Sequence, residues 1–195
     1  MTVPTEILSG SGVAADLVGG KAASLDRLMG IGVPVPPTGV ITTDGYRAFV
    51  SGSGIQAFLE ELRSASLPEP AEYGEVTKRI DEAFLTAKMP PELRDQILRL
   101  AAEMRTDGEL AVRSSATAED LAAASFAGQY RSFLEVRTEE ELLRSVRLVW
   151  ASLWLPAPRS YRRFRRIPED DLAMAVVVMR LVDAKLAGVV FTVDP

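Results

Sequence analysis

The residues best suited to chemistry lie in one stretch, AVRSSATAEDLAAASFAGQYRSFLEV, at positions 111–136. Arg113 follows an apolar, strand-like segment, so its charge is expected to emerge where a strand ends. A guanidinium group pairs well with the oxygen atoms of a phosphate. Ser114 and Ser115 add hydroxyl groups, and the backbone amides of residues 125–129 could fold over an anion. The stretch therefore suits a phosphate site. The alternative, which spacing alone favours slightly, is an N-cap followed by a turn and a hairpin.

A second candidate is Gly19-Gly20-Lys21, at an expected loop-to-helix junction. Glycines let the backbone come close to a ligand, free amides at a helix start favour anions, and the lysine adds a mobile charge. These properties also suit a phosphate. The alternative is a flexible helix start with a solvated lysine, because the motif is shorter than a P-loop.

A cluster of arginines surrounds Tyr161 and Phe164 near the C-terminal end. It consists of Arg159, Arg162, Arg163, Arg165 and Arg166. One interpretation is a surface for nucleic acid or a partner protein. The other is a solvated helix face paired with the acidic residues 169–171. The formal net charge of −5 favours the second interpretation, so no nucleic-acid partner is expected.

The length and composition of the chain narrow the class of protein. A chain of 195 residues fits one large domain or two small lobes with a real core. The chain lacks cysteine, which excludes disulfides and thiolate metal sites. No run of 18 uncharged apolar residues and no signal sequence occur, so the expected location is the cytoplasm without a membrane partner.

Histidine is also absent from the chain. Catalysis by a serine–histidine pair, zinc binding through histidine and phosphohistidine chemistry therefore cannot be completed by these residues alone. Any such chemistry needs a histidine from outside the 195 residues.

The elements that must position the candidates follow from hydrophobic periodicity. Helices are predicted at 20–29, after an N-cap at Thr43, three times within 55–104, and at 139–154. Strands are predicted at 39–42, 109–114, 130–137, 174–181 and 188–192. In the third of these, Ser132, Leu134 and Val136 are expected to share one face. The order of elements indicates an α+β fold with a mixed or antiparallel sheet covered by helices.

Three separated blocks carry a family resemblance: VGGKAASLDRLMGIGVPVPPTGVITTDGYRAF, the stretch at 111–136, and MAVVVMRLVDAKLAGVVFTVDP. They resemble the N-terminal nucleotide-binding domain of the family that includes phosphoenolpyruvate synthase, pyruvate phosphate dikinase and rifampicin phosphotransferase. WASLW followed by SYRR is similar to a fourth block. The blocks span residues 17–195 in the family's order, and only 55–104 matches loosely.

This resemblance implies the first lobe of an ATP-grasp-like fold that uses ATP and Mg²⁺. Such enzymes move phosphoryl groups from ATP to a histidine on a separate domain, and then to pyruvate or an acceptor such as rifampicin. The implied partners are ATP and the phosphohistidine and acceptor-binding domains of the full-length enzyme. The lack of histidine in this chain agrees with that division of labour.

The resemblance also assigns individual residues. Lys21 matches the family's lysine that contacts the ATP phosphates, and Arg113 matches its phosphate-binding arginine. Gly128 falls in the loop that covers the triphosphate, and Ser132 stands where relatives use threonine or a similar residue near the nucleotide. Met179 occupies the strand position beside adenine where the family usually has glutamine.

Departures from the family pattern limit the activity that we expect of residues 1–195. Ala157 stands where an arginine is common, and the family's metal ligands are expected beyond residue 195. We therefore expect no catalytic or metal-binding residue within residues 1–195, a helical insertion at about 55–104, and a second lobe missing at the C-terminus. The fragment alone is expected to be inactive. The alternative, favoured by Met179 and Ala157, is a degenerate stand-alone lobe that binds or regulates without catalysis.

Overall fold

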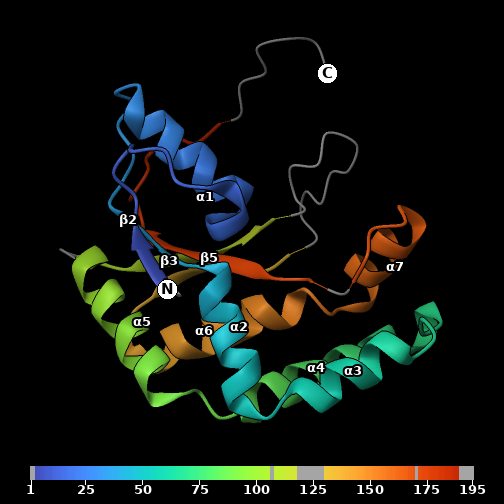
Figure 1. The fold of residues 1–195 in the computed structure, drawn as a ribbon. Coiled ribbons are helices and arrows are strands. Elements are labelled where there is room, and N and C mark those ends of the chain that lie inside the picture. The colour runs from blue at the N-terminus through green and yellow to red at the C-terminus, as the bar shows by residue number, and fades with distance from the viewer. Residues whose placement is uncertain (1–2, 106–107, 118–129, 170, 189–195) are drawn as a thin grey trace.

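A central β-sheet with helices on both faces forms the fold, as the computed structural model in Figure 1 shows. The structure describes residues 3–105, 108–117, 130–169 and 171–188. The strands are β1 (Thr5–Ile7), β2 (Thr38–Ile41), β3 (Leu110–Ala116), β4 (Ser132–Val136) and β5 (Met174–Arg180). The helices are α1 (Ala15–Gly30), α2 (Thr43–Ser53), α3 (Gln56–Ser64), the 3-10 helix η1 (Pro70–Glu72), α4 (Tyr73–Thr86), α5 (Pro91–Met104), α6 (Glu139–Ser152) and α7 (Pro156–Phe164).

The strand order is β1-β2-β5-β3-β4, and every neighbouring pair is antiparallel. Of the predicted alternatives, a mixed or an antiparallel sheet covered by helices, the structure has the antiparallel one. Strand β5 lies at the centre because its alternating residues are buried on both sides. Val176 and Val178 belong to the larger core cluster, whereas Ala175 and Val177 belong to a smaller one beneath α1. The predicted strand at 188–192 falls almost wholly outside the described residues.

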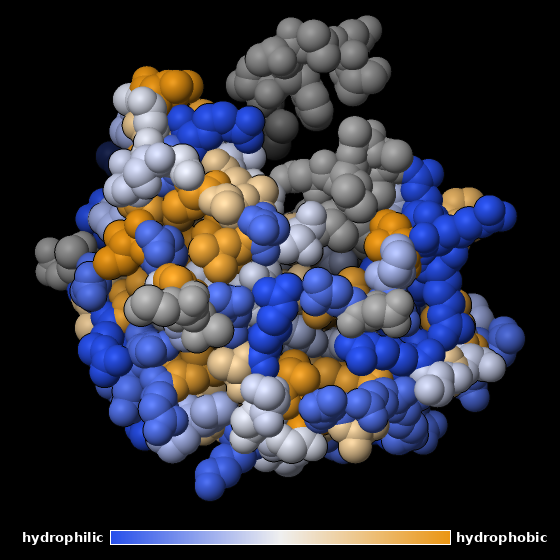
Figure 2. All heavy atoms as spheres, viewed as in Figure 1, coloured by the Kyte–Doolittle hydropathy of each residue, from blue (hydrophilic) through white to orange (hydrophobic). Residues whose placement is uncertain are grey.

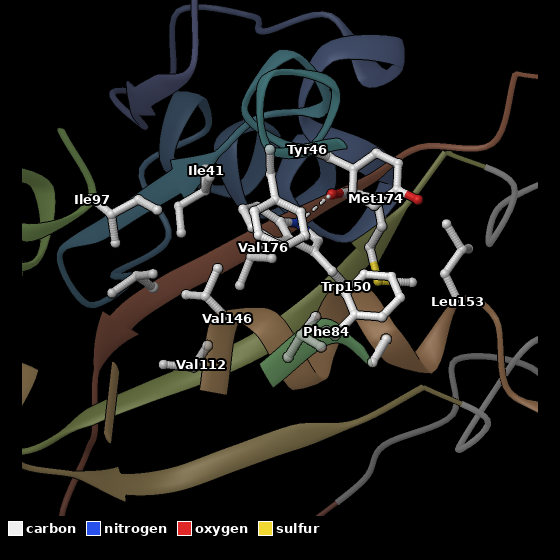
Figure 3. Packing of buried hydrophobic residues seen from close by; sticks show 14 of the residues in the cluster. Ile41, Tyr46, Phe84, Ile97, Val112, Val146, Trp150, Leu153, Met174 and Val176 are labelled. Atoms are coloured by element: carbon white, nitrogen blue, oxygen red, sulfur yellow. Dashed lines mark hydrogen bonds between the residues drawn. The ribbon is translucent and has the colours of Figure 1, made fainter. Parts of the chain in front are cut away.

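The larger core lies between the sheet and helices α2, α4, α5 and α6 (Figure 3). Its centre is Trp150, whose Nε1 donates a hydrogen bond of 3.1 Å to the carbonyl oxygen of Met174. The ring of Phe49 lies 4.9 Å from that of Trp150, and Phe84 stacks on Phe49 at 6.0 Å. Aromatic side chains from three helices therefore pack against the middle of the sheet.

Most helices agree with the periodicity of the sequence. The predicted stripe on α5 is buried and consists of Leu93, Ile97, Leu100, Ala101 and Met104. Helix α6 begins at a capping box in which Thr138 and Glu141 satisfy each other's backbone N–H groups. At the start of α2 the capping residue is Thr42, because its Oγ1 accepts from the Gly45 N–H, so the predicted cap at Thr43 was wrong by one position. Within the described ranges, no helix is long and apolar enough to cross a membrane.

The arginine cluster lies on α7, and the prediction of a solvated face was wrong for two of its members. Arg159 and Arg162 are buried, and both guanidinium groups pair with Glu169, at 3.5 and 2.9 Å. Arg159 also donates to the carbonyl oxygen of Leu62, and Arg163 donates to that of Ala65 at 2.8 Å. Carbonyl groups at the C-terminal end of α3, which lack partners within the helix, attract these cations. Figure 2 shows a predominantly hydrophilic surface over α7.

Candidate functional site

The two phosphate-binding candidates of the sequence meet where α1 crosses the end of β3. Gly19 has φ 75° and ψ 163°, which interrupts the helical geometry of α1 at that residue. A Cβ atom at Gly19 would lie 2.0 Å from the carbonyl oxygen of Ser115. Only glycine permits this close approach together with a positive φ. The glycine pair therefore serves contact between α1 and β3, in addition to any role toward a ligand.

Two hydrogen bonds fasten this crossing, although the residues involved lie 93 positions apart. The Lys21 Nζ donates to the carbonyl oxygen of Ser114 at 2.6 Å, and the Ala22 N–H donates to the Ser115 Oγ at 3.1 Å. Lys21 is half-buried and Ser115 is fully buried. The alternative interpretation of Lys21 as a solvated lysine is therefore wrong, because its ammonium group holds α1 on the strand. The Ser115 hydroxyl, expected to face a ligand, is instead buried between α1 and β3.

Arg113, Ser132 and Met179 share the face of the sheet that α1 covers. Arg113 is paired across the strands with Ser132 on one side and Val177 on the other. Val177 is buried beneath α1, and directly paired residues point to the same face. Met179, two residues further along β5, packs partly buried against the same small cluster. Four of the five predicted site residues therefore lie on one side of the sheet.

Exposure separates these residues into two groups. Arg113 and Ser132 are exposed, whereas Lys21 and Met179 are half-buried. The Lys21 ammonium group contacts the backbone of Ser114, which is the residue next to Arg113. Two cations and a hydroxyl group consequently occupy one rim of the sheet. Charge-assisted hydrogen bonds from such groups suit the oxygen atoms of a phosphate.

The strand end beside Met179 has fewer free backbone donors than its sequence suggests. The Arg180 N–H donates to the carbonyl oxygen of Pro37 at 3.2 Å, and the Leu181 N–H donates to that of Glu109 at 2.8 Å. Val182 is exposed and has no backbone N–H partner among the described residues. A planar ligand at this strand end would therefore find its backbone donor at Val182.

Two further positions, Gly128 and Ala157, were singled out in the sequence. Gly128 lies outside the described residues. Ala157 is exposed on α7, a helix that packs against α4 on the opposite side of the sheet from α1. Among the residues that the structure describes, no group of three acidic side chains is arranged to hold a metal ion.

One positioning residue, Asp26, was missed in the sequence. Its carboxylate is 1% exposed and accepts four backbone N–H groups. The donors are Ser9, Gly10, Gly12 and Val13, at 3.1, 2.7, 2.8 and 3.1 Å. These bonds fix the segment that leads into α1. The available signal was an aspartate four residues after Ala22, on the buried face of an amphipathic helix.

Burial on its own would raise the pKa of the Asp26 carboxyl group. The four N–H groups oppose this and bring its pKa below the ordinary value of 3.8. Asp26 is thus an anion that stabilises the loop before the glycine motif, and its charge is already satisfied within the protein.

Known proteins resemble the chain over most of its length. Residues 15–195 match the family described as pyruvate phosphate dikinase, AMP/ATP-binding domain. The chain is 41% identical over 186 residues to the phosphoenolpyruvate synthase of Aeropyrum pernix. It is 34% identical over 181 residues to the rifampicin phosphotransferase of Bacillus cereus, and 39% identical over 179 residues to the prodigiosin synthesizing transferase PigC of Serratia marcescens.

These three alignments cover 92%, 92% and 91% of this chain. They cover 23%, 21% and 18% of the respective relatives. The chain thus spans less than a quarter of the length of these proteins.

Proposed function

Because the chain belongs to the pyruvate phosphate dikinase AMP/ATP-binding domain family, we propose that it is the ATP-binding part of a longer phosphotransferase. The observation that carries this proposal is the meeting of the glycine motif with β3. Lys21 is hydrogen-bonded to the carbonyl group next to the exposed Arg113, so both cations lie at one rim of the sheet. That rim suits a triphosphate because phosphate oxygens favour several charge-assisted donors.

In this proposal, Arg113 and Lys21 neutralise the phosphate charge, and the Ser132 hydroxyl orients it from the adjacent strand. Gly128 belongs to the loop that covers the triphosphate. Met179 lies beside adenine, where its thioether provides an apolar contact without a side-chain hydrogen bond. The Val182 N–H is the backbone donor proposed for the base. A bound Mg²⁺ ion would neutralise further phosphate charge, with ligands from outside residues 1–195.

The proposed reaction moves a phosphoryl group from ATP to a histidine on a separate domain, and then to pyruvate or a small acceptor such as rifampicin. Relatives described as phosphoenolpyruvate synthase and rifampicin phosphotransferase support this class of acceptor. Residues 1–195 would form the first lobe of an ATP-grasp-like domain with a helical insertion at 55–104. Phosphoryl transfer depends mainly on positioning and charge neutralisation, which this rim can contribute.

The second candidate is a degenerate lobe that binds or regulates without catalysis. Met179 supports it, because the thioether is packed partly against the core beneath α1 and offers no amide to adenine. Ala157 supports it as well, because its methyl group cannot replace a guanidinium group. Under this alternative the protein retains nucleotide binding at most, and no phosphohistidine forms.

Calorimetric titration with ATP, with and without Mg²⁺, tests the binding proposal. Replacing Arg113 or Lys21 by alanine should each weaken ATP binding by about tenfold or more, since hydrogen bonds to charged groups contribute about 1.5–3 kcal/mol. Arg94→Ala is the matched control, because Arg94 is exposed on α5 on the other side of the sheet. Equal affinity in wild type, Arg113→Ala and Lys21→Ala would contradict the assignment of the site.

The two candidate functions differ in their product. If the enzyme hypothesis is correct, the natural full-length protein incubated with ATP should carry a phosphohistidine detectable by mass spectrometry at neutral or alkaline pH. ATP binding that requires Arg113, without any phosphohistidine in the full-length protein, would instead support the degenerate lobe.

A further inference from the structure

A cavity of about 220 Å³ lies between α2, α3 and the segment that enters β5. Its lining includes Tyr46, Arg47, Arg63 and Asp171. It lies on the side of the sheet that α2, α5 and α6 cover, whereas Arg113 and Ser132 lie on the side that α1 covers. The cavity is therefore separate from the proposed ATP site, and none of its lining residues has been given a role there.

Arg63 is the unusual member of this lining. Its guanidinium group lies 5.2 Å from the ring centroid of Trp154, in a cation–π contact. The Nε atom of Arg63 is buried, and the side chain forms no hydrogen bond or ion pair with any residue in the described part of the chain. A buried guanidinium N–H that lacks an acceptor is costly, because this donor has been removed from water without replacement.

Among the described residues, the other charges around the cavity do not compensate that of Arg63. Arg47 is paired with Asp171 and with Asp44, each at 3.4 Å, so the acidic residue of the lining already faces a cation. Behind the cavity, Arg159 and Arg162 share one carboxylate, that of Glu169. Among the described residues, four arginines in this region, those at positions 47, 63, 159 and 162, thus face three carboxylates, those of Asp44, Asp171 and Glu169.

Unused donors accompany this excess of charge. The Nε atom of Arg159 and the Nη1 atom of Arg162 are buried and have no acceptor among the described residues. The Tyr46 hydroxyl accepts from the Trp154 Nε1 at 2.8 Å, which leaves its own O–H to donate. Burial raises the pKa of Tyr46 to about 12, so this hydroxyl remains a donor at neutral pH.

From these contacts we infer that the cavity is a binding site for a small oxyanion, a phosphate or a carboxylate, held by Arg63, whose guanidinium group lies over the ring of Trp154. A guanidinium group stacked on an aromatic ring presents its edge for two parallel hydrogen bonds to such an anion. The Tyr46 hydroxyl provides a neutral donor beside it. The volume accommodates a small ion or the acidic group of a small metabolite, and it is too small for a whole nucleotide.

The two tryptophans of the chain allow a direct test by ¹⁵N–¹H NMR. The Trp154 indole N–H is bonded to Tyr46 at the cavity, whereas that of Trp150 is bonded to Met174 in the core. Titration with inorganic phosphate, and separately with acetate, should shift the Trp154 indole signal saturably and leave that of Trp150 nearly unchanged. Chloride at matched ionic strength corrects for screening. No saturable shift with either anion would overturn the proposal.

Variants identify the anion's contact. Arg63→Gln should weaken the response of Trp154 by about tenfold or more, since a charge-assisted contact is lost. Arg165→Gln is the matched control, because Arg165 also lies over an aromatic ring, that of Tyr161, but does not line the cavity. A Trp154 response of unchanged affinity in Arg63→Gln would refute the inference.

Two further variants keep the result interpretable. If Arg63→Gln does not fold, Tyr46→Phe tests the second donor and should weaken binding severalfold. Arg113→Gln separates this site from the proposed ATP site, because it should leave the Trp154 response unchanged. Loss of that response in Arg113→Gln would mean that the anion acts from the other face, and the cavity proposal would fail while the ATP proposal survived.

Discussion

Compared with the face of the sheet that α2, α5 and α6 cover, the face beneath α1 buries few side chains. Among the described residues, the larger cluster on the helix-covered side contains thirty buried hydrophobic residues and the cluster beneath α1 contains six. On the α1 side, Arg113 and Ser132 are exposed at the β3–β4 end of the sheet. The face covered by α2, α5 and α6 thus supplies most of the buried apolar area, while the face beneath α1 keeps polar groups accessible to a ligand.

The two faces also differ in how their helices are attached. Aromatic packing around Trp150 holds the large helical layer. Helix α1 is held in part by backbone contacts, namely the close approach of Gly19 to Ser115 and the Lys21 and Ala22 hydrogen bonds to β3. Substitutions in the large helical layer should therefore change stability alone. Substitutions between α1 and β3 should change stability and ligand binding together.

The largest effect is expected from Phe84→Ala on α4. Phe84 is fully buried and stacks on Phe49, so its loss removes transfer free energy and leaves a cavity. We expect the free energy of unfolding to fall by about 3–5 kcal/mol. ATP affinity, measured by calorimetry well below the unfolding transition, should remain unchanged. A parallel loss of affinity would show that the two faces are not independent.

Gly19→Ala should have the next largest effect on stability and should also weaken ATP binding. An alanine Cβ would overlap the Ser115 carbonyl oxygen and would also require a positive φ, so we expect a loss of about 3 kcal/mol in chemical denaturation. ATP affinity should fall with it, because Lys21 is displaced. Gly32→Ala is the control, since Gly32 has φ 82° but open space around its Cβ position. That variant should cost about 1–2 kcal/mol and leave ATP affinity intact.

Much of the fold could be predicted from the sequence because local periodicity matched the final packing. The stripe of α5 and the helix α6 follow from repeating apolar positions, and the central strand β5 follows from a continuous apolar run. Strand β4 was predicted with the wrong faces. Glu135 adopts φ 57° at a bulge, so Phe133 and Val136 both face the larger core. Simple alternation cannot predict where an extra residue interrupts it.

The residues of the candidate site could be predicted from the sequence, but the hydrogen-bond partners of their neighbours could not. Residue types and the family resemblance pointed to Lys21 and Arg113, and the strand pairing places Ser132 directly opposite Arg113. The sequence could not reveal that the Ser115 hydroxyl would cap a backbone N–H of α1, or that Asp26 would gather four N–H groups. Both depend on contacts between segments whose relative placement is a tertiary property.

Asp26→Asn should lower stability by about 2–3 kcal/mol, because an amide accepts fewer hydrogen bonds than a carboxylate and loses their charge assistance. The effect should depend on pH. The folded-state pKa of Asp26 is depressed, so its stabilisation is complete above the unfolded pKa of about 3.9 and disappears as the pH falls through the folded value.

Denaturation curves at pH 7 and at pH 3 and below test this prediction. Wild type and Asp26→Asn should differ at neutral pH and converge in strong acid. Asp16→Asn is the control, because Asp16 is exposed in the first turn of α1. A difference between wild type and Asp26→Asn that stays constant down to the lowest pH would contradict the role of the ionised carboxylate.

The smallest effect concerns the link between the two faces. Arg131, immediately before β4, forms two hydrogen bonds with Asp81 of α4, at 2.6 and 3.0 Å. The next residue, Ser132, lies on the opposite face beside Arg113. This ion pair therefore ties the helical layer to the strand that carries a proposed ligand contact. The two side chains are 27% and 23% exposed, so the pair is screened only in part by solvent.

Asp81→Asn should lower the free energy of unfolding by about 1–2 kcal/mol, more than an exposed pair contributes and less than a fully buried one. Glu82→Gln is the matched control, because Glu82 is exposed and its contact with Lys78 is 3.9 Å. That variant should have almost no effect. ATP affinity should fall by less than threefold in Asp81→Asn, since β3 alone fixes Arg113. A loss as large as that of Arg113→Ala would show that α4 controls the site through Arg131, and the helix-covered face would then share in ligand binding.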